Sequence, residues 1–216
     1  MHFTSETGLH LRSLLMSMGA ALLLGCGGGV KGDTNNIEIR ALNMALANKA
    51  RDLNLIYLDT YAILLTNAGK PLVFFYEHDG EHLSELGYLR WADAILVPYI
   101  KFNKVTCAGM VGDSITRRVS VVQMQNPTRD ATWDDLLGIK TYNMGVDGET
   151  SGDVLKRLDQ LIQPDIDRYF LMIGNNDLHA AIPIPQVIAN VETIVRYLKD
   201  HSGKPVVIQA VMPLNR

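Results

Sequence analysis

Short apolar runs alternate with longer amphipathic segments from Ile37 onward, and this alternation restricts the fold more than any other feature. The runs have the length of strands that are buried on both faces, and they cover residues 55–58, 105–111, 139–146, 169–173 and 206–211. The segments between them repeat apolar residues at helical spacing. Strands separated by helices in this way form a parallel sheet with helices on both faces. The sequence therefore predicts one α/β domain of three layers, flavodoxin-like, with a five-stranded parallel sheet.

Composition excludes several other classes of protein. The 216 residues are 47% hydrophobic and 20% charged, which does not suit a disordered chain, a collagen-like fibre or a multi-pass membrane protein. The formal net charge is −3. Without a basic stripe to hold a phosphate backbone, no nucleic-acid partner is expected.

The first segment is expected to lie outside the folded domain. Residues 14–24 read LLMSMGAALLL, about half the length of a transmembrane helix but typical of a secretory signal. The following Leu23–Cys26 resembles a bacterial lipobox, whose cysteine is lipidated. We therefore predict a lipoprotein-type signal over residues 1–25, a flexible tether over 26–36 and the folded domain over 37–216. The protein would be exported, to the periplasm or cell surface, with Cys26 as its membrane anchor. A buried helix with a glycine cap is the alternative.

Four polar clusters lie where the predicted sheet would place a ligand, since ligands bind beyond the carboxyl ends of parallel strands. Three of them follow predicted strands and the fourth immediately precedes a helix: Gly112–Ser114, Asn143–Thr150, Gly174–Asp177 and Asp79–His82. Each cluster taken alone is typical of a turn or a helix cap. Their joint occurrence at strand ends predicts a single site.

Together the clusters supply what acyl transfer requires. A serine hydroxyl such as that of Ser114 becomes a nucleophile when a base within hydrogen-bond reach takes its proton. His82 is the candidate for that base. Asp79 lies three residues earlier and is able to hold the imidazole in one tautomer. The backbone amides of Ser114 and Gly148 and the side-chain amide of Asn176 would donate to the oxyanion. A glycine at 148 would let that amide approach closely, or would merely supply a positive φ.

Over residues 37–216 the sequence resembles the SGNH (GDSL-type) hydrolases. Gly112–Ser114 matches the nucleophile block of that family, Asn143–Gly148 its glycine block, Gly174–Asp177 its Gly-x-Asn-Asp block and Asp79–His82 its Asp-x-x-His block. The resemblance implies Ser114, His82 and Asp79 as catalytic residues and Ser114, Gly148 and Asn176 as the oxyanion hole. It implies neither a metal nor a cofactor.

The order of the blocks departs from the family, in which the Asp-x-x-His block comes last. Here His82 precedes Ser114. We interpret this as a circular permutation in which residues 100–104 form the new joint, a normal length for a connection between a helix and a strand. Because triads are defined by geometry and not by chain order, the site is expected to assemble. A rearranged gene whose product folds poorly is the alternative.

The leading hypothesis is a serine ester hydrolase that releases a small acyl group, acetyl by analogy with compact members of that family, from a small-molecule, glycan or lipid ester. The rivals are a lysophospholipase or thioesterase with a longer acyl pocket, a non-catalytic glycan-binding surface lipoprotein, and a dinucleotide-binding flavodoxin-like protein. A dinucleotide-binding protein would need the motif Gly-x-Gly-x-x-Gly between a strand and a helix, and this sequence does not have it there. A metal site built from His78, His82 and Asp177 is a minor alternative. Trp91, Trp133 and Cys107 are predicted to pack in the core.

Overall fold

Five parallel strands form the centre of the computed structural model, which describes residues 31–117 and 133–216. The strands are β1 (Ile56–Leu58), β2 (Cys107–Gly112), β3 (Lys140–Gly145), β4 (Arg168–Met172) and β5 (Val206–Gln209). Their order across the sheet is β1-β5-β4-β2-β3, and all neighbours run parallel. Each strand coincides with one of the apolar runs. The predicted α/β fold with a five-stranded parallel sheet is confirmed.

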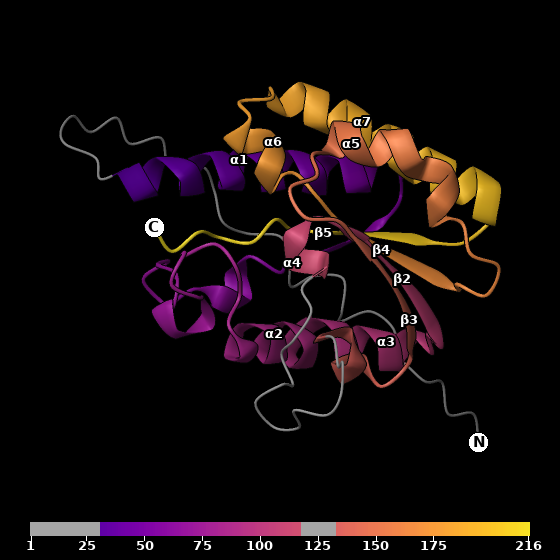
Figure 1. Cartoon of the computed structure of the whole chain (residues 1–216), viewed down its shortest axis with the longest axis horizontal. Coiled ribbons are helices and arrows are strands. Elements are labelled where there is room, and N and C mark those ends of the chain that lie inside the picture. Colours follow the sequence, from indigo (N-terminus) through magenta and orange to yellow (C-terminus); the bar gives the residue numbers. More distant parts are fainter. Residues whose placement is uncertain (1–30, 118–132) are drawn as a thin grey trace, which may run out of the picture.

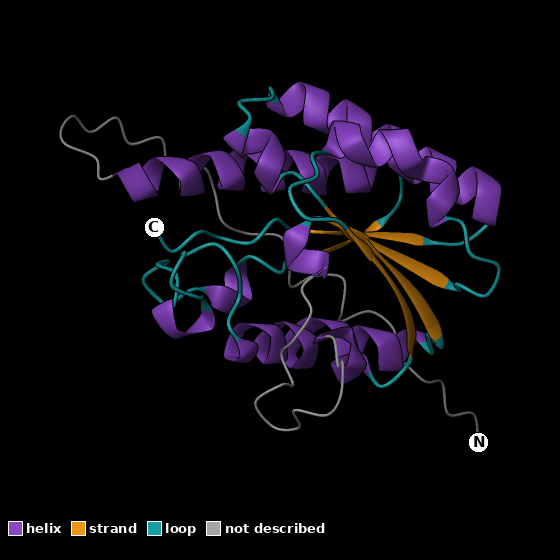
Figure 2. Cartoon of the chain, in the orientation of Figure 1, coloured by secondary structure: helices purple, strands orange, loops and turns teal. Residues whose placement is uncertain are grey.

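The sheet separates two hydrophobic cores, because successive side chains of a strand point to opposite faces. In β4 and just beyond it, Tyr169, Leu171 and Ile173 belong to one core. Phe170 and Met172 belong to the other. A strand with apolar side chains on both faces needs a helical layer on each side, which is the three-layer arrangement seen in Figure 1 and Figure 2.

The helical layers divide between the two faces. α1, α5, α6 and α7 lie on one side of the sheet, and α2 and α3 lie on the other (Figure 1). The α-helices are α1 (Lys31–Asp52), α2 (Glu85–Trp91), α3 (Val97–Asn103), α4 (Ser114–Arg117), α5 (Ser151–Val154), α6 (Asn175–His179) and α7 (Ile184–Ser202). Short 3₁₀ segments are η1 (Ala62–Leu64), η2 (Val73–Phe75), η4 (Trp133–Leu137) and η5 (Leu155–Leu161), and η3 (Ala92–Leu96) is a π-helical turn. None of the helices in the described ranges is long and apolar enough to cross a membrane.

The predicted tether over residues 26–36 is wrong in its second half. α1 begins at Lys31, inside that segment. Asn36 is buried, and its side chain makes two hydrogen bonds with the backbone of Leu214. This tertiary contact orders a stretch whose composition alone is too polar to pack. The predicted signal over 1–25 and the lipidated Cys26 lie outside the described residues.

The helix after the fourth cluster also differs from its prediction. We expect it to end at Pro98, but helical structure continues to Asn103. Pro98 occupies the first turn of α3 and follows the π-helical turn η3, where Val97 N–H donates to the carbonyl of Ala92. A wider turn of this kind accommodates the missing proline N–H. The connection to β2 is consequently shorter than the predicted joint over residues 100–104.

On that helix we expect Leu86, Leu89, Ala92 and Leu96 to face the core; Ala92 and Leu96 are buried as predicted, Leu89 is half-buried, and the prediction is wrong for Leu86. Leu86 is 54% exposed, whereas Tyr88 and Trp91 are fully buried. Trp91 stacks on Trp133 with ring centroids 4.4 Å apart. The predicted packing of both tryptophans is confirmed. The other core prediction holds as well, since Cys107 is a free and buried thiol.

Candidate active site

The polar clusters meet at the carboxyl edge of the sheet, around a cavity of about 600 Å³. Its lining consists of Glu81, His82, Ser114, Arg117, Asp147, Gly148 and Asn176. These residues come from the segments that follow β2, β3 and β4 and from the loop that precedes α2. Four of the five predicted site residues line this cavity. The fifth, Asp79, lies directly behind His82.

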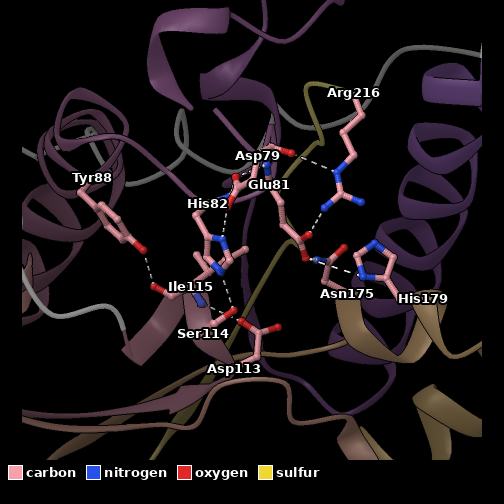
Figure 3. Close-up of polar contacts among 10 residues, drawn as sticks. All are labelled: Asp79, Glu81, His82, Tyr88, Asp113, Ser114, Ile115, Asn175, His179 and Arg216. Atoms are coloured by element: carbon pink, nitrogen blue, oxygen red, sulfur yellow. Dashed lines mark hydrogen bonds and ion pairs between the residues drawn. The ribbon is translucent and has the colours of Figure 1, made fainter. Parts of the chain in front are cut away.

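Ser114 begins α4 directly after β2, so that its hydroxyl points from the edge of the sheet into the cavity. The turn is held by Asp113, whose Oδ1 accepts from the backbone N–H of Ile115 at 3.0 Å. The Tyr88 hydroxyl donates to the carbonyl of Ile115 at 2.8 Å (Figure 3). Trp133 Nε1 donates to the carbonyl of Thr116 at 2.7 Å. The aromatic layer under the sheet therefore anchors the helix that carries Ser114.

The loop containing His82 folds around Asp79. Asp79 Oδ1 accepts from the backbone amides of Glu81 and His82, both at 2.9 Å. This local turn brings Asp79 Oδ2 to 2.7 Å from His82 Nδ1. On the other side of the ring, His82 Nε2 lies 3.0 Å from Ser114 Oγ (Figure 3). Asp79, His82 and Ser114 thus form a continuous chain of polar contacts, although the histidine and the serine are 32 positions apart in the sequence.

The two aspartates beside the serine and the histidine have opposite environments. Partial burial works to raise the pKa of Asp79, but hydrogen bonds from the His82 ring and from the amides of Glu81 and His82 outweigh it and hold the pKa at about 2. Asp79 is therefore ionised near neutral pH and favours a proton on His82 Nδ1. Burial raises the pKa of Asp113 to about 7, and the nearby Glu81 carboxylate adds to the effect. Asp113 sits below Ser114 as a carboxyl group that titrates near neutrality.

The three predicted oxyanion donors border the same cavity. One N–H of the Asn176 amide donates to the carbonyl of Glu149 at 2.9 Å, which orients the side chain and leaves a second N–H. Gly148 has a φ of +75°, the positive φ that is one of the two expected reasons for a glycine there, and a Cβ at this position would meet no protein atom within 4 Å. Gly145 packs closely against the backbone, since a Cβ there would lie 2.3 Å from the backbone nitrogen of Arg117.

Two residues of the site escaped prediction. Glu81 lines the cavity and is bonded to Asn175, 94 residues away. Arg216 donates to the carbonyl of Asp79 at 3.2 Å and pairs with Glu81. No sequence pattern signals either contact, because each joins segments that are far apart in the sequence.

The residues of the alternative metal site are not brought together. His78 is exposed on the loop, whereas Asp177 is fully buried and accepts from the backbone and the hydroxyl of Ser151. Asp177 thus braces the start of α5. Within residues 31–117 and 133–216, no group of three metal-binding side chains is placed to hold an ion.

Part of the chain matches a known protein family. The model of the GDSL-like lipase/acylhydrolase family matches residues 110–216, from the middle of β2 to beyond β5. No curated protein matches the chain.

Several solved structures are similar at low identity. A protein from Streptococcus pneumonia is 21% identical, with 58% of this chain and 51% of that one covered and a TM-score of 0.39. A G-D-S-L family protein from Desulfitobacterium hafniense is 17% identical over 48% of this chain and 58% of that one, with a TM-score of 0.38. An acetylxylan esterase from Geobacillus stearothermophilus is 20% identical over the same two shares, with a TM-score of 0.33. The chain spans about half the length of these structures.

Proposed function

We propose that the chain is a carboxylic ester hydrolase of the GDSL-like lipase/acylhydrolase family, whose model matches residues 110–216, and that it acts through an acyl-enzyme on Ser114. One observation carries the proposal. His82 lies between Asp79 and Ser114 at hydrogen-bond distance from both, 2.7 Å on the Nδ1 side and 3.0 Å on the Nε2 side. This is the geometry by which a base activates a serine hydroxyl.

The proposed reaction has two halves. His82 Nε2 takes the proton of Ser114 Oγ as that oxygen attacks the acyl carbonyl carbon, and Asp79 stabilises the imidazolium that forms. The backbone amides of Ser114 and Gly148 and the amide of Asn176 donate to the oxyanion. As the tetrahedral intermediate collapses, His82 returns the proton to the leaving alcohol. Water, deprotonated by His82, then attacks the acyl-enzyme, and its collapse releases the acid and regenerates Ser114.

The lining of the cavity supports a small acyl group and a polar alcohol. Among the described residues that border it, none has a large apolar side chain. The outer rim carries the ion pair between Arg117 Nη1 and Asp147 Oδ2, 2.5 Å apart. A long acyl chain gains affinity by burying its methylene groups against apolar surface, and these residues offer it none. We therefore place acetyl first among the candidate acyl groups, on a hydroxyl-rich alcohol such as a sugar.

A series of p-nitrophenyl esters tests this proposal. We expect kcat/KM to be highest for the acetate and to fall by about 10-fold or more by the octanoate, since each added methylene finds no apolar contact. Rates that rise with chain length would favour the lysophospholipase or thioesterase alternative. Absence of turnover with every ester, from a folded protein, would favour the glycan-binding alternative.

The order of the motif blocks supports a circular permutation, which is the second part of the proposal. β1, the first strand of the chain, lies at the sheet edge beside β5, the last strand. The Asn36 amide donates to the Leu214 carbonyl at 2.7 Å, and the Leu214 N–H donates to Asn36 Oδ1 at 2.9 Å. The N-terminal part of α1 therefore touches the segment that follows β5. A short link between them would restore the order of the family.

Rejoining the chain tests the permutation. In a variant with residues 105–216 first, a short glycine-serine linker, and residues 31–104 last, we expect the same circular dichroism spectrum and ester hydrolysis within a few-fold of the original, because the linker spans segments already in contact. The same rearranged chain with Ser114→Ala is the control for background hydrolysis. A rearranged chain that fails to fold, while the original folds, would contradict the permutation.

A further inference from the structure

The carboxylate of Glu81 does not face its neighbours in the catalytic loop. Figure 3 shows the side chain turned away from the His82 ring and toward α6 and the segment after β5. Its Oε1 accepts from Asn175 Nδ2 at 2.7 Å, and its Oε2 accepts from the Arg216 guanidinium. His179 Nδ1 lies 3.6 Å from Oε1. The Glu81 side chain is only 14% exposed, whereas that of Arg216 is 41% exposed, so the carboxylate is the buried partner of this ion pair.

The segment after β5 holds the same loop through the backbone. Asn215 N–H donates to the carbonyl of Gly80 at 2.7 Å, and Arg216 Nε donates to the carbonyl of Asp79 at 3.2 Å. The internal bonds of the loop are local, such as those from Asp79 Oδ1 to two nearby amides. Local bonds of this kind define the shape of a turn but not its placement over the sheet. The contacts with residues 175, 215 and 216 join residues 79–81 to α6 and to the segment after β5.

We propose that Glu81 and Arg216 are positioning residues, which place His82 against Ser114 and against the oxyanion donor Asn176. The inference rests on the proposed function of the site. Asn175 directly precedes Asn176 and is almost fully buried, and its Oδ1 has no hydrogen-bond partner among residues 31–117 and 133–216. Its amide group is therefore tied to the site through Glu81. One carboxylate connects the loop of the general base to the helix that carries the oxyanion donor.

Burial separates this cluster from an ordinary surface ion pair. Exposed pairs contribute little, typically less than about 1 kcal/mol. Glu81 instead accepts from two separate segments at a position that borders the catalytic cavity. Loss of its carboxylate leaves the Asn175 amide and the guanidinium without their acceptor. The loop is then free to shift, and a displacement of about 1 Å between reacting groups costs up to about 100-fold in rate.

Phosphonylation of Ser114 by a p-nitrophenyl methylphosphonate provides the test. Ser114 Oγ forms a bond to phosphorus, p-nitrophenolate leaves, and His82 takes the serine proton, so the rate reports the alignment of these two residues. We expect Glu81→Ala to lower the phosphonylation rate and the kcat for p-nitrophenyl acetate by about 10- to 100-fold, with KM within about 2-fold. Glu81→Gln keeps an oxygen that accepts from Asn175, so we expect a loss of less than about 10-fold, similar to that of Arg216→Ala.

The matched control is Arg196→Ala, because Arg196 also pairs with a glutamate, Glu192, but is 62% exposed on α7 and remote from the cavity. It is expected to react at the wild-type rate. Rates are expressed per titrated serine, so a variant that is merely less stable would show fewer sites at an unchanged rate. Glu81→Ala and Arg216→Ala reacting at the wild-type rate would overturn the positioning role. A folded wild-type protein whose Ser114 is never labelled would overturn the proposed function, and this inference with it.

Discussion

Replacing Ser114 with alanine is expected to lower kcat/KM for p-nitrophenyl acetate by about 10⁴-fold or more. The hydroxyl lies 3.0 Å from His82 Nε2 and borders the cavity, so its removal deletes the nucleophile that the mechanism requires. The change removes one oxygen from a side chain that packs at the cavity wall, and the fold is expected to persist.

The two proteins are compared by initial rates and by far-ultraviolet circular dichroism. Ser202→Ala is the matched control, since Ser202 ends α7 and its hydroxyl bonds to the carbonyl of Leu198, far from the cavity. That variant is expected to hydrolyse the ester at the wild-type rate. Equal rates from wild type and a well-folded Ser114→Ala protein would exclude the acyl-enzyme. Negligible rates from both would move the glycan-binding hypothesis to first place.

Asp113→Asn is expected to make the protein more stable above pH 7 than the wild type. Asp113 is buried under Ser114, and burial raises its pKa from 3.8 to about 7 in the folded protein. Between these two values the folded state holds a proton that the unfolded state has released, so the free energy of unfolding falls as the pH rises from about 4 to about 7. At 1.36 kcal/mol for each pKa unit, the loss is of the order of 4 kcal/mol. An asparagine stays neutral and still accepts from the amide of Ile115.

Urea denaturation at a series of pH values between 4.5 and 8.5 measures this effect. The difference in unfolding free energy between Asp113→Asn and the wild type should grow with pH and level off above about 7, while contributions of other groups cancel. Asp200→Asn, at an exposed position on α7, is the control and should show a difference that does not change with pH. A constant difference for Asp113→Asn as well would show that Asp113 is not protonated in the folded protein at low pH.

Strand positions could be predicted because the information is local. A run such as residues 206–211 is apolar at every position, and this pattern is typical of a strand covered on both faces. The structure has β5 at Val206–Gln209 within that run. The core face of α7 is also predictable from the sequence, because Val187, Val191, Ile194, Val195 and Leu198 repeat at helical spacing, and all five are buried.

Local signals were misleading where a distant contact outweighed them. Pro98 is typical of the end of a helix, but the π-helical turn before it allows the helix to continue. Leu86 reads as a core residue, yet Tyr88 and Trp91 fill the space below the sheet. The start of α1 reads as a polar tether, yet Asn36 is buried against Leu214. In each case tertiary packing overrides local propensity.

The sequence by itself determined the fold class and indicated five residues as one site. Both could be predicted because apolar periodicity and the residues that follow each strand are local features of the sequence. The tertiary structure decided how those residues are held. Asn175 meets Glu81 across 94 residues, and Arg216 meets the same carboxylate across 135. Such contacts depend on how the strands pair and how the segments beyond them pack. No local pattern encodes a contact between side chains that only the folded sheet brings to one edge.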